Sequence, residues 1–312
     1  MNESDLLARI YARSAGLSRF AQVVAGPGHD CAVVDAGADG GGSRLLLKVD
    51  QVVMGRHVRP GTPVDLIGRK AVARAVSDIA AAGGRPLAAL AGAVVPSAFD
   101  ADGLFDAVFQ WAAHWGCPLV GGDISGGSEM AVSIAVVGLP HATRGPVLRS
   151  GARPGDEVWV TGRLGGSYDA ATGLGRHLTF EPRLAEAAWL CDALGEGLRA
   201  MMDLSDGLGR DAARLARASG VRVRVEAGTL PSHEGVDWRR AMRDGEDYEL
   251  LFVVGAGASE RWRRTAEAAG GRTPTGVPLT RIGRMEAGQG ACVVEFDGRD
   301  EDASEWGWEH GE

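Results

Sequence analysis

Segments with helical spacing and short apolar runs typical of strands are mixed along the whole chain. Residues 3–14 place apolar side chains at helical spacing behind an acidic first turn. The apolar runs at 31–35 and 44–50 predict two strands around a glycine-rich turn at 37–42. The chain is therefore expected to begin with a helix that leads into paired strands.

A long helix reaching about Ala82 is expected to follow, because Thr62 is a cap residue ahead of Pro63 at the first helical position. The later segments continue the mixture of helices and strands. They are a buried strand at 86–95, an amphipathic helix over 101–115 with Trp111 and Trp115 on one face, strands near 118–121 and 130–138, a strand at 157–161, a helical region at 183–194, a strand ending at Asp203, a helix over 206–218, strands at 221–226 and 248–254, a helix near 257–269, and strands near 281–285 and 291–296.

Prolines and glycines gather between residues 140 and 155, and such residues punctuate loops and domain boundaries. A chain of 312 residues suits two domains of roughly 150 residues each. We therefore expect an N-terminal domain over 1–143 and a C-terminal domain over 144–312. Since helices and strands mix in both halves, the expected fold class is α/β or α+β.

Composition narrows the class of protein. The net charge of −8 disfavours nucleic-acid binding, which needs a basic face. The four cysteines are scattered and signal neither a zinc site nor a disulfide framework. The first residues lack the apolar region of a signal peptide, and the most apolar stretch, 79–96, is interrupted by glycine, arginine and proline. We expect a cytoplasmic protein without membrane contact. The chain has two lysines, Lys48 and Lys70, and its other basic residues are arginines.

Six aspartates end apolar runs, open expected helices or interrupt one. Carboxylates gathered at strand ends repel one another unless cations lie between them. Mg²⁺ is the natural neutraliser, because it combines a few carboxylates with the phosphates of a nucleotide. The pattern therefore indicates an enzyme that uses Mg²⁺ and ATP. The six residues are Asp30, Asp50, Asp78, Asp123, Asp203 and Asp206.

The sequence lacks the phosphate-binding motifs of other nucleotide enzymes. There is no G-x-x-x-x-G-K-[ST] segment, and the two G-x-G starts lack a third glycine. Asp203 and Asp206 flank the expected start of a helix, whose free N–H groups favour phosphate. The alternative is that Ser205 or Asp206 only caps that helix. Gly122 and Asp123 follow a strand in the same way, and their alternative is a simple turn.

Four further residues are candidates for ligand contacts, and three of them have a structural alternative. His57 can contact a substrate phosphate or be a packed histidine, and Arg149 can pair with ATP or be a solvated loop residue. Glu246 belongs to an acid-rich strand start that needs a positive partner. Trp308 can stack on a cationic ring or pack as part of the C-terminal tail.

Seven motifs in chain order resemble the thiamine-monophosphate kinase family, within the superfamily of aminoimidazole ribonucleotide synthetase and selenophosphate synthetase. One such motif is weakly specific, but seven in order are highly specific. The matching segments are Gly28-His-Asp30-Cys-Ala-Val, Val49-Asp50-Gln-Val-Val-Met-Gly55-Arg-His57, Gly68-Arg-Lys70-Ala through Ser77-Asp78-Ile-Ala-Ala-Ala-Gly83, Gly121-Gly-Asp123-Ile-Ser, Arg149-Ser-Gly-Ala-Arg-Pro-Gly-Asp156, Asp203-Leu-Ser-Asp206-Gly-Leu and Gly245-Glu-Asp-Tyr-Glu-Leu.

The resemblance implies two α/β domains, a homodimer in which the N-terminal sheets pair, and direct phosphoryl transfer from ATP to thiamine phosphate. A phosphate nucleophile is already largely ionised near neutral pH, so no general base is needed. By resemblance the Mg²⁺ ligands are Asp30, Asp50, Asp78, Asp123, Asp203 and Asp206, the ATP contacts are Gly122, Asp123, Arg149 and Ser205, and the thiamine-phosphate contacts are His57, Glu246 and Trp308.

The chain departs from the family pattern at His29, Lys48, Val49 and Asp244. We hypothesise that the ammonium of Lys48 substitutes for the charge of one metal ion or touches a phosphate. The alternatives are that Lys48 points into solvent or marks a subgroup with weakened or altered activity. Two other functions stay open at this point. One is another ATP-dependent reaction of the superfamily, and the other is nucleotide binding without catalysis, which retention of all six aspartates disfavours.

Overall fold

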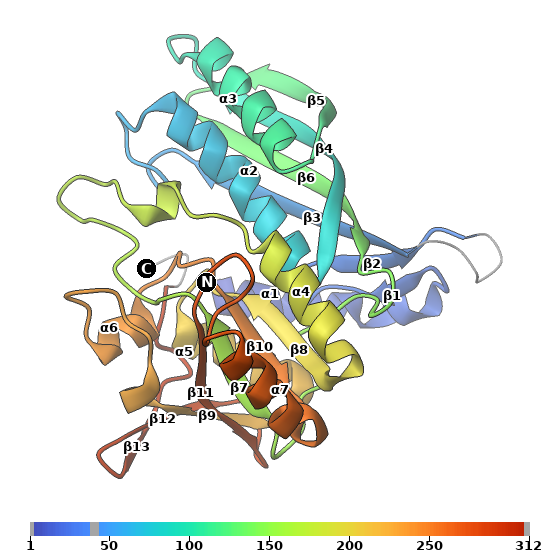
Figure 1. Cartoon of the computed structure of the whole chain (residues 1–312). Helices are drawn as coiled ribbons and strands as arrows, with labels where there is room; N and C mark the ends of the chain where they lie inside the picture. The colour runs from blue at the N-terminus through green and yellow to red at the C-terminus, as the bar shows by residue number, and fades with distance from the viewer. Residues whose placement is uncertain (1–2, 38–43, 309–312) are drawn as a thin grey trace.

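The computed structural model describes residues 3–37 and 44–308, and within them the chain forms two β-sheets that lie one above the other in Figure 1. The first sheet has six strands in the order β1-β2-β3-β6-β4-β5, and the second has seven in the order β13-β12-β9-β11-β7-β10-β8. Each sheet is built from one half of the chain. The mixed α/β class expected from the sequence is confirmed.

The strands alternate with helices along the chain. The helices are α1 (Glu3–Ser14), α2 (Val64–Ala81), α3 (Ala101–His114), α4 (Leu184–Leu194), α5 (Leu208–Ser219), α6 (Trp238–Arg243) and α7 (Ala256–Ala268), with a 3₁₀ turn η2 at Arg176–Leu178. The strands are β1 (Val23–Ala25), β2 (Ala32–Asp35), β3 (Arg44–Val53), β4 (Gly84–Val95), β5 (Leu119–Gly126), β6 (Ala131–Pro140), β7 (Glu157–Thr161), β8 (Leu198–Asp203), β9 (Arg222–Glu226), β10 (Leu250–Val254), β11 (Leu279–Glu286), β12 (Cys292–Phe296) and β13 (Arg299–Asp302).

Helices α2 and α3 cover one face of the N-terminal sheet (Figure 1). Side chains alternate across a strand, so one face of β3 carries buried Leu46 and Val52 toward the helices, with Lys48 and Asp50 between them. The opposite face leaves Leu47 and Val49 exposed. The site residues of β3 thus lie on the side of the sheet that faces α2.

Helix α2 joins the two halves of the molecule. Nearly all of its residues from Ile67 to Ala81 are buried, and most of its apolar side chains pack in the N-terminal core. Ala80 and Ala81 instead belong to a second core with Leu190 of α4 and Phe252 of β10. A polar side chain on α2 can therefore meet residues from the C-terminal sheet.

Most expected elements are present, but several details differ. The strand expected at 86–95 is not fully buried, because α2 covers only one of its faces and Leu90 and Val94 are exposed. Pro63 flanks α2 without entering it, and the Thr62 hydroxyl donates to the Arg59 carbonyl oxygen and does not cap the helix. Short β1, α6 and β13 were not predicted, since three to six residues carry too little periodicity.

Two other expectations concern loops. The expected turn at 37–42 falls mostly outside the described residues. Helix α5 begins at Leu208, two residues later than expected, because Gly207 precedes it with a φ of 115° that only glycine adopts readily. In the described ranges, no helix has the length and apolar character needed to cross a membrane.

Candidate functional site

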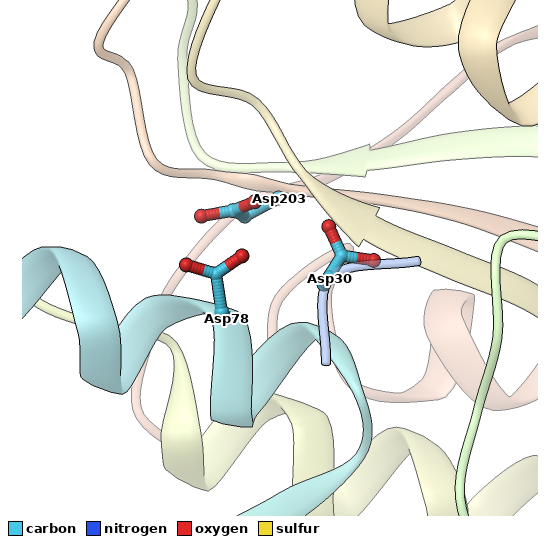
Figure 2. Close-up of side chains that lie close together, drawn as sticks. All are labelled: Asp30, Asp78 and Asp203. Atoms are coloured by element: carbon cyan, nitrogen blue, oxygen red, sulfur yellow. The ribbon is translucent and has the colours of Figure 1, made fainter. Parts of the chain in front are cut away.

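Three of the six aspartates meet between the two sheets, and we call Asp30, Asp78 and Asp203 the acidic cluster. Asp30 precedes β2, Asp78 lies on α2 and Asp203 ends β8, and their carboxyl groups face a common space (Figure 2). Each offers one oxygen, and these oxygens all lie within 4.8 Å of one another. All three residues are buried. The expectation that distant acidic segments converge is met for these three.

Cations of the chain reach two members of the acidic cluster. The Lys48 Nζ atom lies 2.9 Å from Oδ1 of Asp78, and the Arg149 Nη2 atom lies 2.6 Å from Oδ1 of Asp30. Asp203 instead accepts a hydrogen bond of 2.6 Å from the Ser77 hydroxyl. Arg149 is therefore not a solvated loop residue, and Lys48 does not point into solvent.

The environment raises the pKa of Asp203, Asp78 and Lys48, but for different reasons. Burial, followed by repulsion from Asp30, raises the pKa of Asp203 to about 6. Burial also raises the pKa of Asp78 well above its usual range, although Lys48 opposes that shift. For Lys48, burial lowers the pKa, but the carboxylates of Asp78 and Asp50 outweigh it and raise the pKa overall. The acidic cluster thus has a strong need for positive charge.

Asp50 lies close to this group but outside the acidic cluster. Its Oδ1 atom is 3.2 Å from Nη2 of Arg74, one turn before Asp78 on α2. Burial raises the pKa of Asp50, but Arg74 and Lys48 outweigh it and lower the pKa overall. Asp50 is therefore an ionised carboxylate at the edge of the cluster.

The loop after β8 is held by an aspartate that sequence reasoning missed. Oδ2 of Asp211 accepts hydrogen bonds from the backbone N–H groups of Ser205, at 3.0 Å, and Asp206, at 2.9 Å. Arg214 pairs with both Asp206 and Asp211. Neither Ser205 nor Asp206 caps α5 with its side chain. The signal for Asp211 was its place one turn into the helix, where an acid can reach back to free N–H groups.

A cavity of about 500 Å³ opens beside the acidic cluster and is lined by both halves of the chain. It includes three of the expected substrate contacts, His57, Glu246 and Trp308. Ser205 and Asp206 also line it, two and three residues after Asp203. Five arginines contribute to its wall: Arg56, Arg59, Arg74, Arg240 and Arg243. The cavity therefore combines a cationic wall with a few fixed carboxylates.

Glu246 is held in this cavity by two fully buried side chains. Its Oε1 atom lies 2.5 Å from Nζ of Lys70, and its Oε2 atom lies 3.2 Å from Nδ1 of His177. Burial alone would raise the pKa of Glu246, but Lys70 and His177 lower it to about 2. Its φ of 61° is unusual for a residue other than glycine. Glu246 is thus a rigid, ionised carboxylate.

The acids near Glu246 each have their own partner, so the acid-rich strand start is stable without a bound ligand. Asp247 accepts from the Ser167 hydroxyl at 2.6 Å, and Glu249 pairs with Arg183 at 2.5 Å. Lys70 and His177 were not predicted as site residues. For Lys70 the available signal was that a chain rich in arginine keeps lysine at this place.

His57 and Trp308 face the cavity in different ways. The Val53 N–H donates to Nδ1 of His57 at 3.0 Å, which fixes the imidazole ring against the end of β3. Trp308 is half exposed, and its backbone N–H donates to the Asp206 carbonyl oxygen at 2.7 Å. The last described residue thus closes one side of the cavity.

Gly122 and Asp123 are not near the acidic cluster in the single chain. Both are exposed on β5, the edge strand of the N-terminal sheet. Strands β6 and β4 separate β5 from β3, which carries Asp50. Asp123 pairs in register with Gly92 of β4, away from the C-terminal sheet.

Comparisons with known proteins agree with this architecture. The family described as AIR synthase related protein, N-terminal domain, matches residues 28–139, and the corresponding C-terminal domain family matches residues 153–295. Thiamine-monophosphate kinase of Rhodopirellula baltica is 33% identical, covering 99% of this chain and 98% of its own. The enzyme of Escherichia coli is 31% identical, covering 94% and 93%.

Solved structures give the same result. AaThiL, in complex with AMPPCP and TMP, superposes with a TM-score of 0.78 at 29% identity and covers 99% of this chain and 97% of its own. The hydrogenase maturation protein HypE in complex with ATP superposes at 0.68, but its 20% identity, with 83% and 84% coverage, indicates a common fold alone. The chain therefore belongs to the AIR synthase related family, in its thiamine-monophosphate kinase branch.

Proposed function

We propose that this protein transfers the γ-phosphoryl group of ATP directly to thiamine phosphate, giving ADP and thiamine diphosphate. The observation that carries the proposal is the position of the acidic cluster beside a cavity of about 500 Å³ that is both cationic and aromatic. An acidic cluster next to a cationic cavity suits two phosphate-bearing substrates that are bound end to end. Thiamine-monophosphate kinases with more than 30% identity along most of the chain support the same reaction.

The chemistry needs positioning and charge neutralisation more than proton transfer. The attacking phosphate is largely ionised at neutral pH, because its second pKa is about 6. Bringing this anion to ATP is opposed by repulsion, which the cationic wall reduces. Arg56, Arg240 and Arg243 line this wall and are assigned to the acceptor phosphate, for which Arg240 would share its contact with Asp244. The ionised Glu246 suits the cationic thiazolium ring or the aminopyrimidine, and Trp308 offers a face for stacking.

The acidic cluster fits Mg²⁺, because its three donors are carboxylate oxygens close enough to share an ion. Asp30, Asp78 and Asp203 would hold it, with Asp50 and Asp206 nearby. When bound, Mg²⁺ neutralises phosphate charge and aligns the reacting oxygens. Arg149 and Ser205 are the proposed ATP contacts on the same side. The proposed boundary between the two domains lies at residues 143 and 144, between the end of β6 and the start of β7.

We further propose that two copies of the chain pair through their N-terminal sheets. The face of this sheet turned away from α2 and α3 leaves Leu47, Val49 and Leu90 exposed, and Val49 is 62% exposed. Exposed apolar area of this kind marks interaction surfaces. The free edge β5 carries Gly122 and Asp123, and pairing would bring these two residues to a site shared between copies.

The test is release of ADP with and without thiamine phosphate, followed by detection of thiamine diphosphate. We expect ADP release that depends on thiamine phosphate and yields one thiamine diphosphate per ADP. ADP release that ignores thiamine phosphate but responds to another phosphate ester would favour a different reaction of the superfamily. Binding of ATP without any ADP release would favour a non-catalytic nucleotide-binding protein. Either result would overturn the proposed function.

A further inference from the structure

The contact between Lys48 and Asp78 places an ammonium inside the acidic cluster. Lys48 lies on the face of β3 directed at α2, and its side chain is only 23% exposed. Its Nζ atom is 2.9 Å from Oδ1 of Asp78, whose side chain is 7% exposed. Asp50, two residues along the same face of β3, and Asp203 also attract this ammonium electrostatically. The amine is therefore fixed by one carboxylate, Asp78, in a field of further negative charge.

The charge balance of the acidic cluster includes this ammonium. Lys48 neutralises Asp78 and Arg149 neutralises Asp30, while the contact of Asp203 is the neutral hydroxyl of Ser77. The acidic cluster therefore carries less uncompensated charge than three bare carboxylates. The negative charge that stays uncompensated is centred on Asp203, at the end of β8 next to the cavity.

An ammonium and a divalent ion compete for the space beside Asp78. Mg²⁺ needs oxygen ligands at about 2.0–2.1 Å in octahedral geometry. A Mg²⁺ bound to the Asp78 oxygen that Lys48 contacts would lie a few ångströms from Nζ, and like charges at that distance repel strongly in a buried site. A second ion between Asp30 and Asp78 would have to displace the amine. The ammonium of Lys48 and a second divalent ion between Asp30 and Asp78 therefore exclude each other.

We propose that the ammonium of Lys48 takes the place of one divalent cation in the acidic cluster. The chain then binds its nucleotide with one divalent ion fewer than it would with a small neutral side chain at position 48. This inference rests on the proposed function only for its Mg²⁺–ATP half, and it does not depend on the acceptor.

The test counts Mn²⁺ ions bound per chain in the presence of saturating AMPPCP, using electron paramagnetic resonance of free Mn²⁺. Lys48→Ser removes the ammonium and opens space, and we expect it to bind one more Mn²⁺ per chain than the unchanged protein. Arg44→Ser removes a positive charge from an exposed position on the same strand and should leave the count unchanged. Equal counts for Lys48→Ser and the unchanged protein would overturn the inference.

A second measurement is made on the unchanged protein, and a variant serves only to assign the signal. Because the chain has two lysines, labelling with [ζ-¹⁵N]lysine gives two ammonium resonances in the unchanged protein. Lys48→Arg, which keeps the positive charge, identifies the resonance of Lys48 by its loss. We expect that resonance to stay protected from solvent exchange after Mg²⁺ and AMPPCP are added. Its loss to rapid exchange would mean that the metal displaces the amine, and the inference would fail.

These measurements separate the inference from the proposed function. Thiamine phosphate is absent from both, so a failure of phosphoryl transfer to thiamine phosphate leaves the Mn²⁺ count intact. An unchanged protein that binds neither Mn²⁺ nor AMPPCP would overturn the proposed nucleotide site together with the inference.

Discussion

The Nζ atom of Lys70 lies 2.5 Å from Oε1 of Glu246, and this contact links helix α2 to the loop before β10. The same ammonium lies 2.9 Å from the His57 carbonyl oxygen and 2.8 Å from Nδ1 of His177. An ammonium has three donors, and here the Glu246 carboxylate and the His57 carbonyl oxygen accept from it. Lys70 therefore connects the two expected substrate contacts, His57 and Glu246, which come from different halves of the chain.

Removing this ammonium should destabilise the fold more than removing both charges. Lys70→Met leaves the partly buried Glu246 with His177 as its remaining partner, and we expect a loss of about 3 kcal/mol in the free energy of unfolding. The double variant Lys70→Met/Glu246→Gln should lose less than the sum of the two single variants. Urea unfolding monitored by tryptophan fluorescence measures all four proteins. Additive losses would show that the contact contributes no coupling energy.

Glu246→Gln should weaken binding of the acceptor, thiamine phosphate, and leave binding of ATP unchanged. Loss of one charge-assisted contact costs about 1.5–3 kcal/mol, so KM for thiamine phosphate should rise about 10- to 100-fold. We expect KM for ATP to stay within about two-fold, because the acidic cluster is separate from Glu246. Glu260→Gln on the exposed face of α7 is the matched control and should change neither constant. A rise in KM for ATP alone would place Glu246 in the nucleotide site.

Removal of divalent ions should destabilise the protein more at pH 8 than at pH 5. The folded-state pKa of Asp203 is raised to about 6, above its ordinary value of 3.8, so its contribution to apo stability declines as pH rises from about 4 to about 6. Above that window the buried carboxylate is ionised and needs a cation. We therefore compare Tm in Mg²⁺ and AMPPCP with Tm in EDTA. The difference between the two Tm values should increase from pH 5 to pH 8.

The same comparison of Tm values with Asp203→Asn tests whether Asp203 causes the pH dependence. The amide does not ionise, so the gain from Mg²⁺ with AMPPCP should be smaller and nearly independent of pH. A gain that keeps its full pH dependence in Asp203→Asn would assign the effect to another group.

A charge on the exposed face of the N-terminal sheet should prevent pairing. Val49→Asp places a carboxylate where the proposed interface excludes water, and we expect a shift from dimer to monomer in light scattering. Phosphoryl transfer should fall with it, because Gly122 and Asp123 would no longer reach a shared site. Leu174→Asp, at an exposed apolar position outside this sheet, is the control and should leave the oligomeric state unchanged. A monomeric but fully active unchanged protein would contradict the proposal.

The sequence by itself determined the elements, the family and the chemical identity of the acids. Helical and strand periodicities are local, so most helices and strands appear where the pattern predicts them. Seven motifs in order identified the family, which the comparisons confirm. The pairing of two copies and the individual ligand roles stay predictions.

Only the tertiary structure decided which of these residues meet. Ser77 contacts Asp203 across 126 residues of sequence, because α2 lies against the end of β8. Strand order placed Asp123 on the far edge of the sheet and Lys48 beside Asp78. Periodicity tells which face a side chain occupies but not which distant strand becomes its neighbour. That choice depends on the packing of the two sheets around α2, which no local pattern encodes.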